Sequence, residues 1–255
     1  MSRLSLLAIL VTVTSISGCG LARDTLPSMD RVVHHAKISA KQPATWLPIA
    51  TAAAIGITGV DNRITDWASD ETPIFGSQSS ARRNSDNFRD ALVAGMSLSS
   101  VFAPTNADDN AFPTRRVVAN TLAFSAVAGI VEVGKVGFGR DRPNNRDDRS
   151  FPSGHSSGAF SSAFLIEKNL NATVERPWLR NTIKAGVFAS ATAVAWARVE
   201  AEEHHPTDVL FSAGLSNFVV NTIYNAVMSE DQAAVTPIAL EASRDGFMFS
   251  LGRTF

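Results

Sequence analysis

Apolar residues are concentrated in six segments of the chain, each long enough to form a helix. The segments are rich in Ala, Ser and Gly, and the alternation of apolar and polar residues that is typical of strands is scarce in them. They cover residues 46–60, 91–102, 117–135, 156–170, 183–198 and 208–228. This pattern predicts an all-α helical bundle over residues 43–229.

Two polar stretches separate these segments. Residues 61–90 are rich in Ser, Asp, Asn and Arg, which predicts a long surface connection that contains a short helix. Residues 137–153, GFGRDRPNNRDDRSFPS, are denser still in Gly, Pro, Asn and charge. A loop of that length inside a compact domain is more often functional than idle, so we expect the chemistry of the protein to lie there.

The N-terminal residues have the layout of an export signal. Arg3 is followed by an apolar run over residues 4–16, which is too short to span a bilayer comfortably. Residues 16–19, ISGC, resemble a bacterial lipobox, in which cleavage before the cysteine leaves Cys19 lipid-modified. Cys19 is the only cysteine of the chain and therefore forms no internal disulfide. We predict a lipoprotein signal peptide over 1–18 and a tether with a peripheral segment over 19–42; the alternative is an ordinary signal peptide with an incidental cysteine.

The last apolar segment raises the question of whether the helices cross a membrane, because residues 209–229 carry no charge and reach spanning length. Asn217, Asn221 and Asn225 recur every four residues in it and so share one helix face. Such amphipathicity favours a water-facing helix over a lipid-facing one. We therefore expect a soluble bundle held at the membrane by its lipid, with integral helices as the alternative. Gly20 gives no acidic retention cue after the cysteine, which favours a periplasm-facing place on the outer membrane of a bacterial cell.

The C-terminal tail, residues 230–255, changes in character. Asp245 and Gly246 separate two strand-like runs, which is the usual signal for a short β-hairpin.

Composition narrows the classes of function. The 255 residues are 45% hydrophobic and carry a formal net charge of −1, without a basic stripe. This balance gives no electrostatic basis for binding nucleic acid, so any anion must be bound locally.

Three short clusters carry residues suited to binding a phosphate. They are Lys135 with Arg142 and Pro143, then residues 152–155 (PSGH), then Arg198 with His204 and Asp208. Taken singly, each has an ordinary explanation as surface charge, a turn or a helix cap. Together they offer complementary groups to one tetrahedral dianion.

The cationic and backbone groups would hold the anion. Ser153 and Gly154 stand where a helix begins, so their N–H groups are expected to be free for a phosphate. Arg142 and Arg198 can each fork onto phosphate oxygens, and Lys135 supplies a point charge. Such donors stabilise the transition state of phosphoryl transfer without a metal or other cofactor.

The histidines would carry the covalent chemistry. A neutral imidazole can attack phosphorus and form a phosphoenzyme if its other nitrogen is held by a partner. His204, with Asp208 four residues later, suits this nucleophilic role, and His155 suits that of the general acid and base. His205 would then serve packing or rim polarity.

These clusters resemble the pattern of the type 2 phosphatidic acid phosphatase superfamily, K-x6-R-P, P-S-G-H and S-R-x5-H-x3-D, which also covers bacterial class A acid phosphatases and vanadium-dependent haloperoxidases. Lys135, Arg142 and Arg198 match the phosphate-binding positions, and Ala197 departs from the serine that is frequent there. The resemblance covers residues 135–208. It implies a helical bundle of the acid phosphatase/vanadium haloperoxidase type, hydrolysis through a phosphohistidine at His204 with His155 as general acid, and inhibition by vanadate in the phosphate site.

We therefore expect a metal-independent phosphatase that acts on phosphate monoesters or on lipid phosphates or diphosphates in the cell envelope. The alternatives are a vanadium-dependent haloperoxidase, whose relatives are usually much larger, and a non-catalytic lipoprotein that binds phospholipid. The sequence leaves open whether the substrate is a lipid or a small phosphoester. It also says nothing of the oligomeric state.

Overall fold

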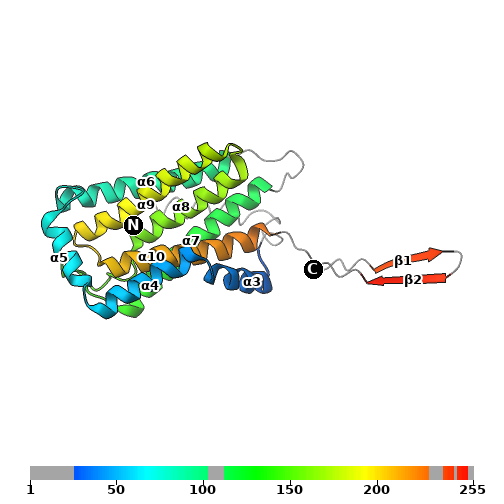
Figure 1. The fold of residues 1–255 in the computed structure, drawn as a ribbon, viewed down its shortest axis with the longest axis horizontal. Coiled ribbons are helices and arrows are strands. Elements are labelled where there is room, and N and C mark those ends of the chain that lie inside the picture. Colours follow the sequence, from blue (N-terminus) through cyan, green and yellow to red (C-terminus); the bar gives the residue numbers. More distant parts are fainter. Residues whose placement is uncertain (1–25, 103–111, 230–237, 244–245, 252–255) are drawn as a thin grey trace, which may run out of the picture.

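The computed structural model describes residues 26–102, 112–229, 238–243 and 246–251. The described residues form a bundle of eight helices and a separate β-hairpin (Figure 1). The helices are α3 (Met29–Ala40), α4 (Pro43–Thr58), α5 (Asp61–Glu71), α6 (Gln78–Phe102), α7 (Phe112–Phe138), α8 (Gly154–Thr173), α9 (Pro177–Glu200) and α10 (Pro206–Met228). The prediction of an all-α bundle is confirmed.

Local sequence signals set where these helices begin. Pro43, Pro177 and Pro206 each stand at the first position of a helix, where the missing N–H removes no intrahelical hydrogen bond. Ser28 and Ser153 cap α3 and α8 by accepting hydrogen bonds from backbone N–H groups of the first turn.

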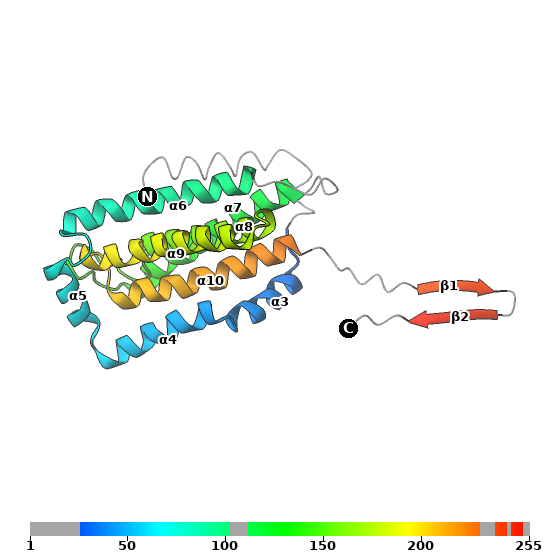
Figure 2. The ribbon, with the colours of Figure 1, turned by 45° about the horizontal axis from the view of Figure 1, so that its top comes forward.

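Helix α10 is the central element of the bundle, with α4 and α3 on one side and α7 and α8 on the other (Figure 2). Gly214 permits the closest approach to α4, because a Cβ atom at this position would lie only 2.5 Å from the carbonyl oxygen of Thr45. The main apolar core lies between α10, α8, α7, α6 and α9 and includes Val127, Leu165 and Val220. This packing fixes the ends of α7, α8, α9 and α10 relative to one another.

The interpretation of the asparagine face of α10 as water-facing is wrong. Asn217 and Asn221 are buried, and Asn217 Nδ2 donates to Thr45 Oγ1 at 2.7 Å and to Gln42 Oε1 at 3.0 Å. Asn221 Nδ2 in turn donates to Asn217 Oδ1 at 2.8 Å. Since α3 and α4 cover this face, its amides are satisfied by protein groups in place of water.

The connection predicted over residues 61–90 is largely helical. Its first part forms α5, which lies across one end of the bundle in both ribbon views, and its last part forms the first half of α6. The polar composition of this segment reflects half-exposed helices, because Ala68 and Ala81 are fully buried while most polar residues of the segment are exposed or half-buried.

The C-terminal hairpin consists of β1 (Ile238–Ser243) and β2 (Gly246–Leu251), which pair antiparallel with Ser243 opposite Gly246. It is drawn apart from the helices in Figure 1. The predicted signal peptide and Cys19 lie outside the described residues.

Hydropathy singles out α7 among the described helices. Its residues Thr114–Phe138 are long and apolar enough to cross a membrane, and 33% of its most apolar window is buried in the bundle. The bent pair of α4 and α5, at 97°, would count as a second such segment if it formed one span. Core helices of soluble proteins share this length and composition, so the lipid-anchored bundle stays a prediction.

Candidate active site

The three sequence clusters meet at one end of the bundle, where α7 and α9 end and α8 and α10 begin (Figure 1). The loop of residues 139–153 joins α7 to α8 across this end, and α5 lies beside it. The contacts described below connect each predicted catalytic and phosphate-binding residue to at least one other residue of this end. The fold therefore gathers groups that are up to 73 positions apart, from Lys135 to Asp208, into one region.

His204 is held as a neutral imidazole with one defined tautomer. Its Nδ1 lies 2.6 Å from the carbonyl oxygen of Ser150, and because a carbonyl only accepts, Nδ1 carries the proton. The His204 side chain is buried, and burial lowers its pKa to about 4, although the neighbouring Asp208 raises that pKa. At neutral pH the Nε2 atom thus holds a lone pair, as a nucleophile requires.

Asp208 lies close to His204 but is not its nearest partner. Its Oδ2 is 3.7 Å from His204 Nδ1, whereas it accepts hydrogen bonds from Ser150 Oγ at 2.6 Å and from the His205 N–H at 2.9 Å. Asp208 therefore acts on His204 through its charge and by fixing Ser150, whose carbonyl holds the ring. Burial would raise the pKa of Asp208, but the adjacent His204 ring, the charge of Arg140 and the Ser150 hydroxyl keep that pKa below its usual value.

Arg140 completes the surroundings of Asp208 and was not selected from the sequence. Its Nη1 donates to Asp208 Oδ1 at 2.5 Å and to Thr207 Oγ1 at 2.7 Å, and its Nη2 pairs with Asp61 Oδ2 at 2.7 Å. Asp61 also accepts the N–H and hydroxyl of Thr207. Arg140 thereby ties the start of α10 to the start of α5.

His155, the second residue of α8, faces α6. Its Nε2 lies 2.6 Å from Asp86 Oδ1 and 2.5 Å from Arg89 Nη1. Burial holds the pKa of His155 well below its usual value, and the positive charges of Arg198 and Arg89 lower that pKa further. The ring is consequently neutral at neutral pH, and a general acid at this position would gain its proton when an anion offsets the cations.

Arg142 and Arg198 lie on the same carboxylate, that of Glu203. Glu203 Oε2 is 2.8 Å from Arg142 Nη1 and 3.2 Å from Arg198 Nη2. Burial lowers the pKa of Arg198 to about 10, which leaves it charged at neutral pH. Its Nε is buried without a hydrogen-bond partner among the described residues, so this guanidinium has a donor left for an anion.

Lys135 reaches the start of α8, where its Nζ lies 3.1 Å from the place that a Cβ on Gly154 would occupy. Gly154 therefore admits the ammonium group next to the helix N-terminus, where anions are favoured. Lys135 also pairs with Glu132 Oε1 at 3.1 Å.

The N–H of Ser153 is not free, contrary to expectation. It donates to Ser212 Oγ at 2.9 Å, and the Ser153 side chain caps α8 by accepting from the Ser156 N–H at 3.4 Å. The first two N–H groups of the helix, those of Gly154 and His155, have no hydrogen-bond partner among the residues with a described position. These two groups are the ones left for an anion.

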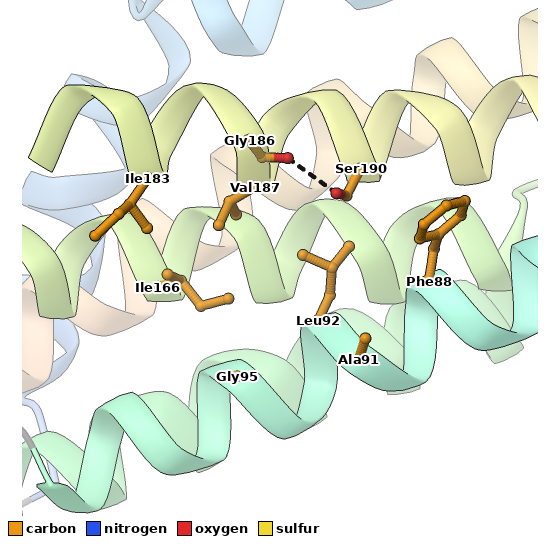
Figure 3. Close-up of a pocket in the computed structure, with 9 residues that line it drawn as sticks. All are labelled: Phe88, Ala91, Leu92, Gly95, Ile166, Ile183, Gly186, Val187 and Ser190. Atoms are coloured by element: carbon orange, nitrogen blue, oxygen red, sulfur yellow. Dashed lines mark hydrogen bonds between the residues drawn. The ribbon is translucent and has the colours of Figure 1, made fainter. Parts of the chain in front are cut away.

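Two hollows lie beside this end of the bundle. A polar one of about 350 Å³ is lined by residues such as Thr65, Asp141, Arg142 and His205, which places His205 at the rim as expected. An apolar one of about 420 Å³ lies along the bundle between α6, α8 and α9 (Figure 3). It is lined by Phe88, Ala91, Leu92, Gly95, Ile166, Ile183, Gly186, Val187 and Ser190. Phe88 adjoins Arg89, the residue that contacts His155, so the apolar groove begins next to the candidate site.

Comparison with known proteins finds similarity in the region of the site. Residues 116–231 match the model of the PAP2 superfamily. A lipid A 1-phosphatase of Porphyromonas gingivalis is 31% identical over 105 residues, which are 41% of this chain and 22% of that protein. The chain thus spans about a fifth of the length of this curated relative.

A solved structure has the same fold. The crystal structure of a transmembrane PAP2 type phosphatidylglycerolphosphate phosphatase from Bacillus subtilis superposes with a TM-score of 0.54 at 22% identity. The match covers 73% of this chain and 96% of that one. At this identity the likeness is one of fold.

Several contributors to the site were not found from the sequence, among them Asp86, Arg89, Arg140 and Glu203. Asp86 and Arg89 lie in the stretch that was predicted as a surface connection, and only the packing of α6 against α8 brings them to His155. Arg140 and Glu203 stand inside the motifs, two residues before Arg142 and directly before His204. Their positions next to the motif residues are the sequence signal by which Arg140 and Glu203 could have been found.

Proposed function

We propose that the protein is a phosphoric ester hydrolase that cleaves lipid phosphates through a phosphohistidine at His204. The observation that carries this proposal is the state of His204, a buried neutral imidazole with Nδ1 protonated and bound to Ser150, beside Arg142 and Arg198. The match to the PAP2 superfamily and the resemblance of part of the chain to a lipid A 1-phosphatase support it.

In the proposed reaction, the phosphate binds to Arg142, Arg198, Lys135 and the free N–H groups at the start of α8. The Nε2 atom of His204 attacks phosphorus, and the bond from phosphorus to the ester oxygen breaks. His155 gives its proton to the leaving oxygen. In the second step His155 takes a proton from water, the water oxygen attacks phosphorus, and inorganic phosphate leaves as the bond to His204 breaks.

The cationic groups stabilise the charge that develops on the phosphoryl oxygens. The mechanism requires a protonated His155, and the pKa of this residue is lowered by burial and by Arg198 and Arg89. A bound phosphate dianion offsets both arginines, so it raises the pKa of His155 toward neutrality. The substrate thus supplies the charge that prepares its own general acid.

A lipid substrate is favoured by the apolar groove in Figure 3. Eight of its nine lining residues offer carbon atoms or no side chain, and it runs along α6 from Phe88 to Gly95, about 10 Å at 1.5 Å per residue. A hydrocarbon chain lying in the groove would have its phosphate end toward Arg89 and His155. A small phosphoester would leave this surface exposed to water.

The activity is tested with the purified protein lacking residues 1–18, assayed for phosphate release from a lipid phosphate, an isoprenoid diphosphate and an aryl phosphate, with and without a chelator. We expect release from the lipid substrates and its loss in His204→Ala. The phosphoenzyme is sought by acid-labile ³²P labelling of the protein. Absence of phosphate release from all three substrates would refute the hydrolase, and full turnover by His204→Ala would refute the nucleophile.

The role of the groove is tested by Gly186→Leu, which adds a side chain where a Cβ has no atom within 4 Å. We expect KM for a long-chain lipid phosphate to rise while turnover of the aryl phosphate stays unchanged. Gly129→Leu is the matched control, because Gly129 also has open space but lies in α7, away from the groove. Equal effects of the two variants on both substrates would exclude a chain-binding groove.

We further propose that the protein is held at the cell envelope by lipid on Cys19. Expression of Cys19→Ala in a bacterium that processes lipoproteins should release the protein into the soluble periplasmic fraction. Continued retention in the membrane fraction would point to the apolar helix α7 as the anchor.

A further inference from the structure

Glu203 is the most heavily paired acid of the candidate site. Its Oε2 contacts Arg142 at 2.8 Å and Arg198 at 3.2 Å, and its Oε1 contacts Arg82 at 2.9 Å and Arg146 at 3.4 Å. The carboxylate is therefore shared between four guanidinium groups. Its side chain is 8% exposed.

The two oxygens of this carboxylate contact two different kinds of arginine. Arg142 and Arg198, on Oε2, are the proposed phosphate binders, and their side chains are 13% and 6% exposed. Arg82 and Arg146, on Oε1, lie outside the three motifs and are 41% and 64% exposed. Glu203 thus lies between an inner, buried pair and an outer pair that reaches solvent.

The charges of this cluster leave room for a second anion. The four guanidinium groups are opposed by the carboxylate of Glu203 and by that of Asp147, which pairs with Arg142 Nε at 2.6 Å. A net charge of two positive units remains, which would balance the two negative charges of a phosphate dianion. Arg198 Nε, buried and without a partner among the described side chains, is a donor that Glu203 does not use.

We propose that Glu203 is an internal competitor for the phosphate site: its carboxylate occupies donors of Arg142 and Arg198 in the phosphate-free protein and is displaced toward Arg82 and Arg146 when phosphate binds. This inference rests on the proposed function of Arg142 and Arg198. This competition would weaken the binding of the inorganic phosphate product, because phosphate leaves as the Glu203 carboxylate returns to Arg142 and Arg198. Arg82 and Arg146 act through Glu203 and do not touch the phosphate.

Glu203→Gln tests the competition directly, since it keeps the size of the side chain and removes its charge. We expect inorganic phosphate to bind this variant about tenfold more tightly or better, as measured by calorimetry and by product inhibition, because a like charge a few Å from the anion is lost. Glu202→Gln is the matched control: it removes the same charge one residue earlier, where among the described residues the carboxylate accepts one hydrogen bond, from Ser69 Oγ at 3.4 Å, and pairs with no arginine. Unchanged or weaker phosphate binding by Glu203→Gln, relative to this control, would overturn the proposal.

A thermal measurement separates competition from a purely structural role. Without phosphate, Glu203→Gln should unfold at a lower temperature than the unmodified protein, because four arginines lose a counter-ion. Saturating phosphate should then raise its unfolding temperature by more than it raises that of the unmodified protein. A variant that is destabilised and gains less from phosphate would show that Glu203 only organises the arginines.

The outer pair gives a second test that retains Glu203. Arg82→Gln weakens the hold on Oε1, so the carboxylate stays longer on Arg142 and Arg198, and phosphate affinity should fall several-fold. In the Glu203→Gln background the same substitution should have little effect, because its action runs through Glu203. An equal loss in both backgrounds would mean that Arg82 attracts phosphate by itself and would overturn its assigned role.

Failure of this inference is distinguishable from failure of the proposed function. If the protein releases phosphate from a lipid substrate but Glu203→Gln does not tighten phosphate binding, only the competition is wrong. If the unmodified protein neither hydrolyses the three substrates nor binds phosphate or vanadate, the site itself is misassigned and the competition falls with it.

Discussion

Replacing Ser150 by alanine isolates one hydrogen bond of the candidate site. The Ser150 hydroxyl donates to Asp208 Oδ2 at 2.6 Å, and both residues are fully buried. The substitution leaves the Ser150 carbonyl, which holds His204 Nδ1 at 2.6 Å, in the main chain. It therefore removes a donor to Asp208 without removing the direct partner of His204, the proposed nucleophile.

A hydrogen bond to a charged group contributes about 1.5–3 kcal/mol to stability. For a domain of this size, 1 kcal/mol corresponds to a shift in Tm of about 2–4 °C, so Ser150→Ala should lower Tm by about 3–12 °C. Asp208 would also lose part of its fixed orientation beside His204. We expect kcat to fall by about 10- to 100-fold with a smaller change in KM, because the loss acts on the nucleophile and not on phosphate binding.

The pH dependence gives a further check on this prediction. The pKa of Asp208 lies below its usual value in the folded protein, so the stabilisation is present above the unfolded carboxyl value of about 3.9 and is lost as pH falls through the folded value. The difference in Tm between the unmodified protein and Ser150→Ala should be full at pH 7. It should narrow below about pH 4.

Ser161→Ala is the matched control for a buried serine in the same bundle. Ser161 is fully buried, and its hydroxyl has no hydrogen-bond partner among the described residues. Its removal should therefore be neutral or slightly stabilising. If Ser150→Ala costs no more stability or activity than Ser161→Ala, the assigned role of the Ser150–Asp208 hydrogen bond is refuted.

Two further predictions concern the start of α8, where phosphate is proposed to bind. Burial and Arg198 lower the pKa of His155, and a bound anion offsets the charge of Arg198, so phosphate binding at neutral pH should be accompanied by uptake of a proton. Calorimetry in buffers of different ionisation enthalpy measures this uptake. Equal proton uptake by the His155→Gln variant would contradict the prediction. Gly154→Ala places a Cβ atom 3.1 Å from Lys135 Nζ and should raise KM about three- to tenfold without loss of Tm, whereas Gly129→Ala, with open space, should leave KM unchanged.

Residue types and spacing carried much of the prediction of the site. Lys135, Arg142 and His204 were selected because their intervals repeat a pattern whose chemistry is understandable residue by residue, and the structure places them at one end of the bundle. Pro206 at the first position of α10 and Asp208 in its first turn are likewise local signals of a helix start. Such signals act over a few residues, so they are visible in the chain itself.

Long-range packing decided what these signals could not. The asparagine face of α10 was read as water-facing because its period is that of an amphipathic helix, but α3 and α4 cover that face and satisfy its amides. The sequence predicts Asp86 and Arg89 to be polar residues of a surface connection, whereas the packing of α6 against α8 places both side chains at His155. Periodicity gives the direction of a helix face and not the element that covers it.

The sequence by itself determined the class of fold and the approximate place of the main helices, and it singled out His204 as the candidate nucleophile, because helix caps, apolar period and motif spacing are local properties. Only the tertiary structure decided which partner each group has. His204 Nδ1 is held by the Ser150 carbonyl and not directly by Asp208, and Glu203 lies on the arginines proposed for phosphate. A hydrogen bond or ion pair depends on distances of a few tenths of an ångström between elements, and those distances are set by the packing of the whole bundle.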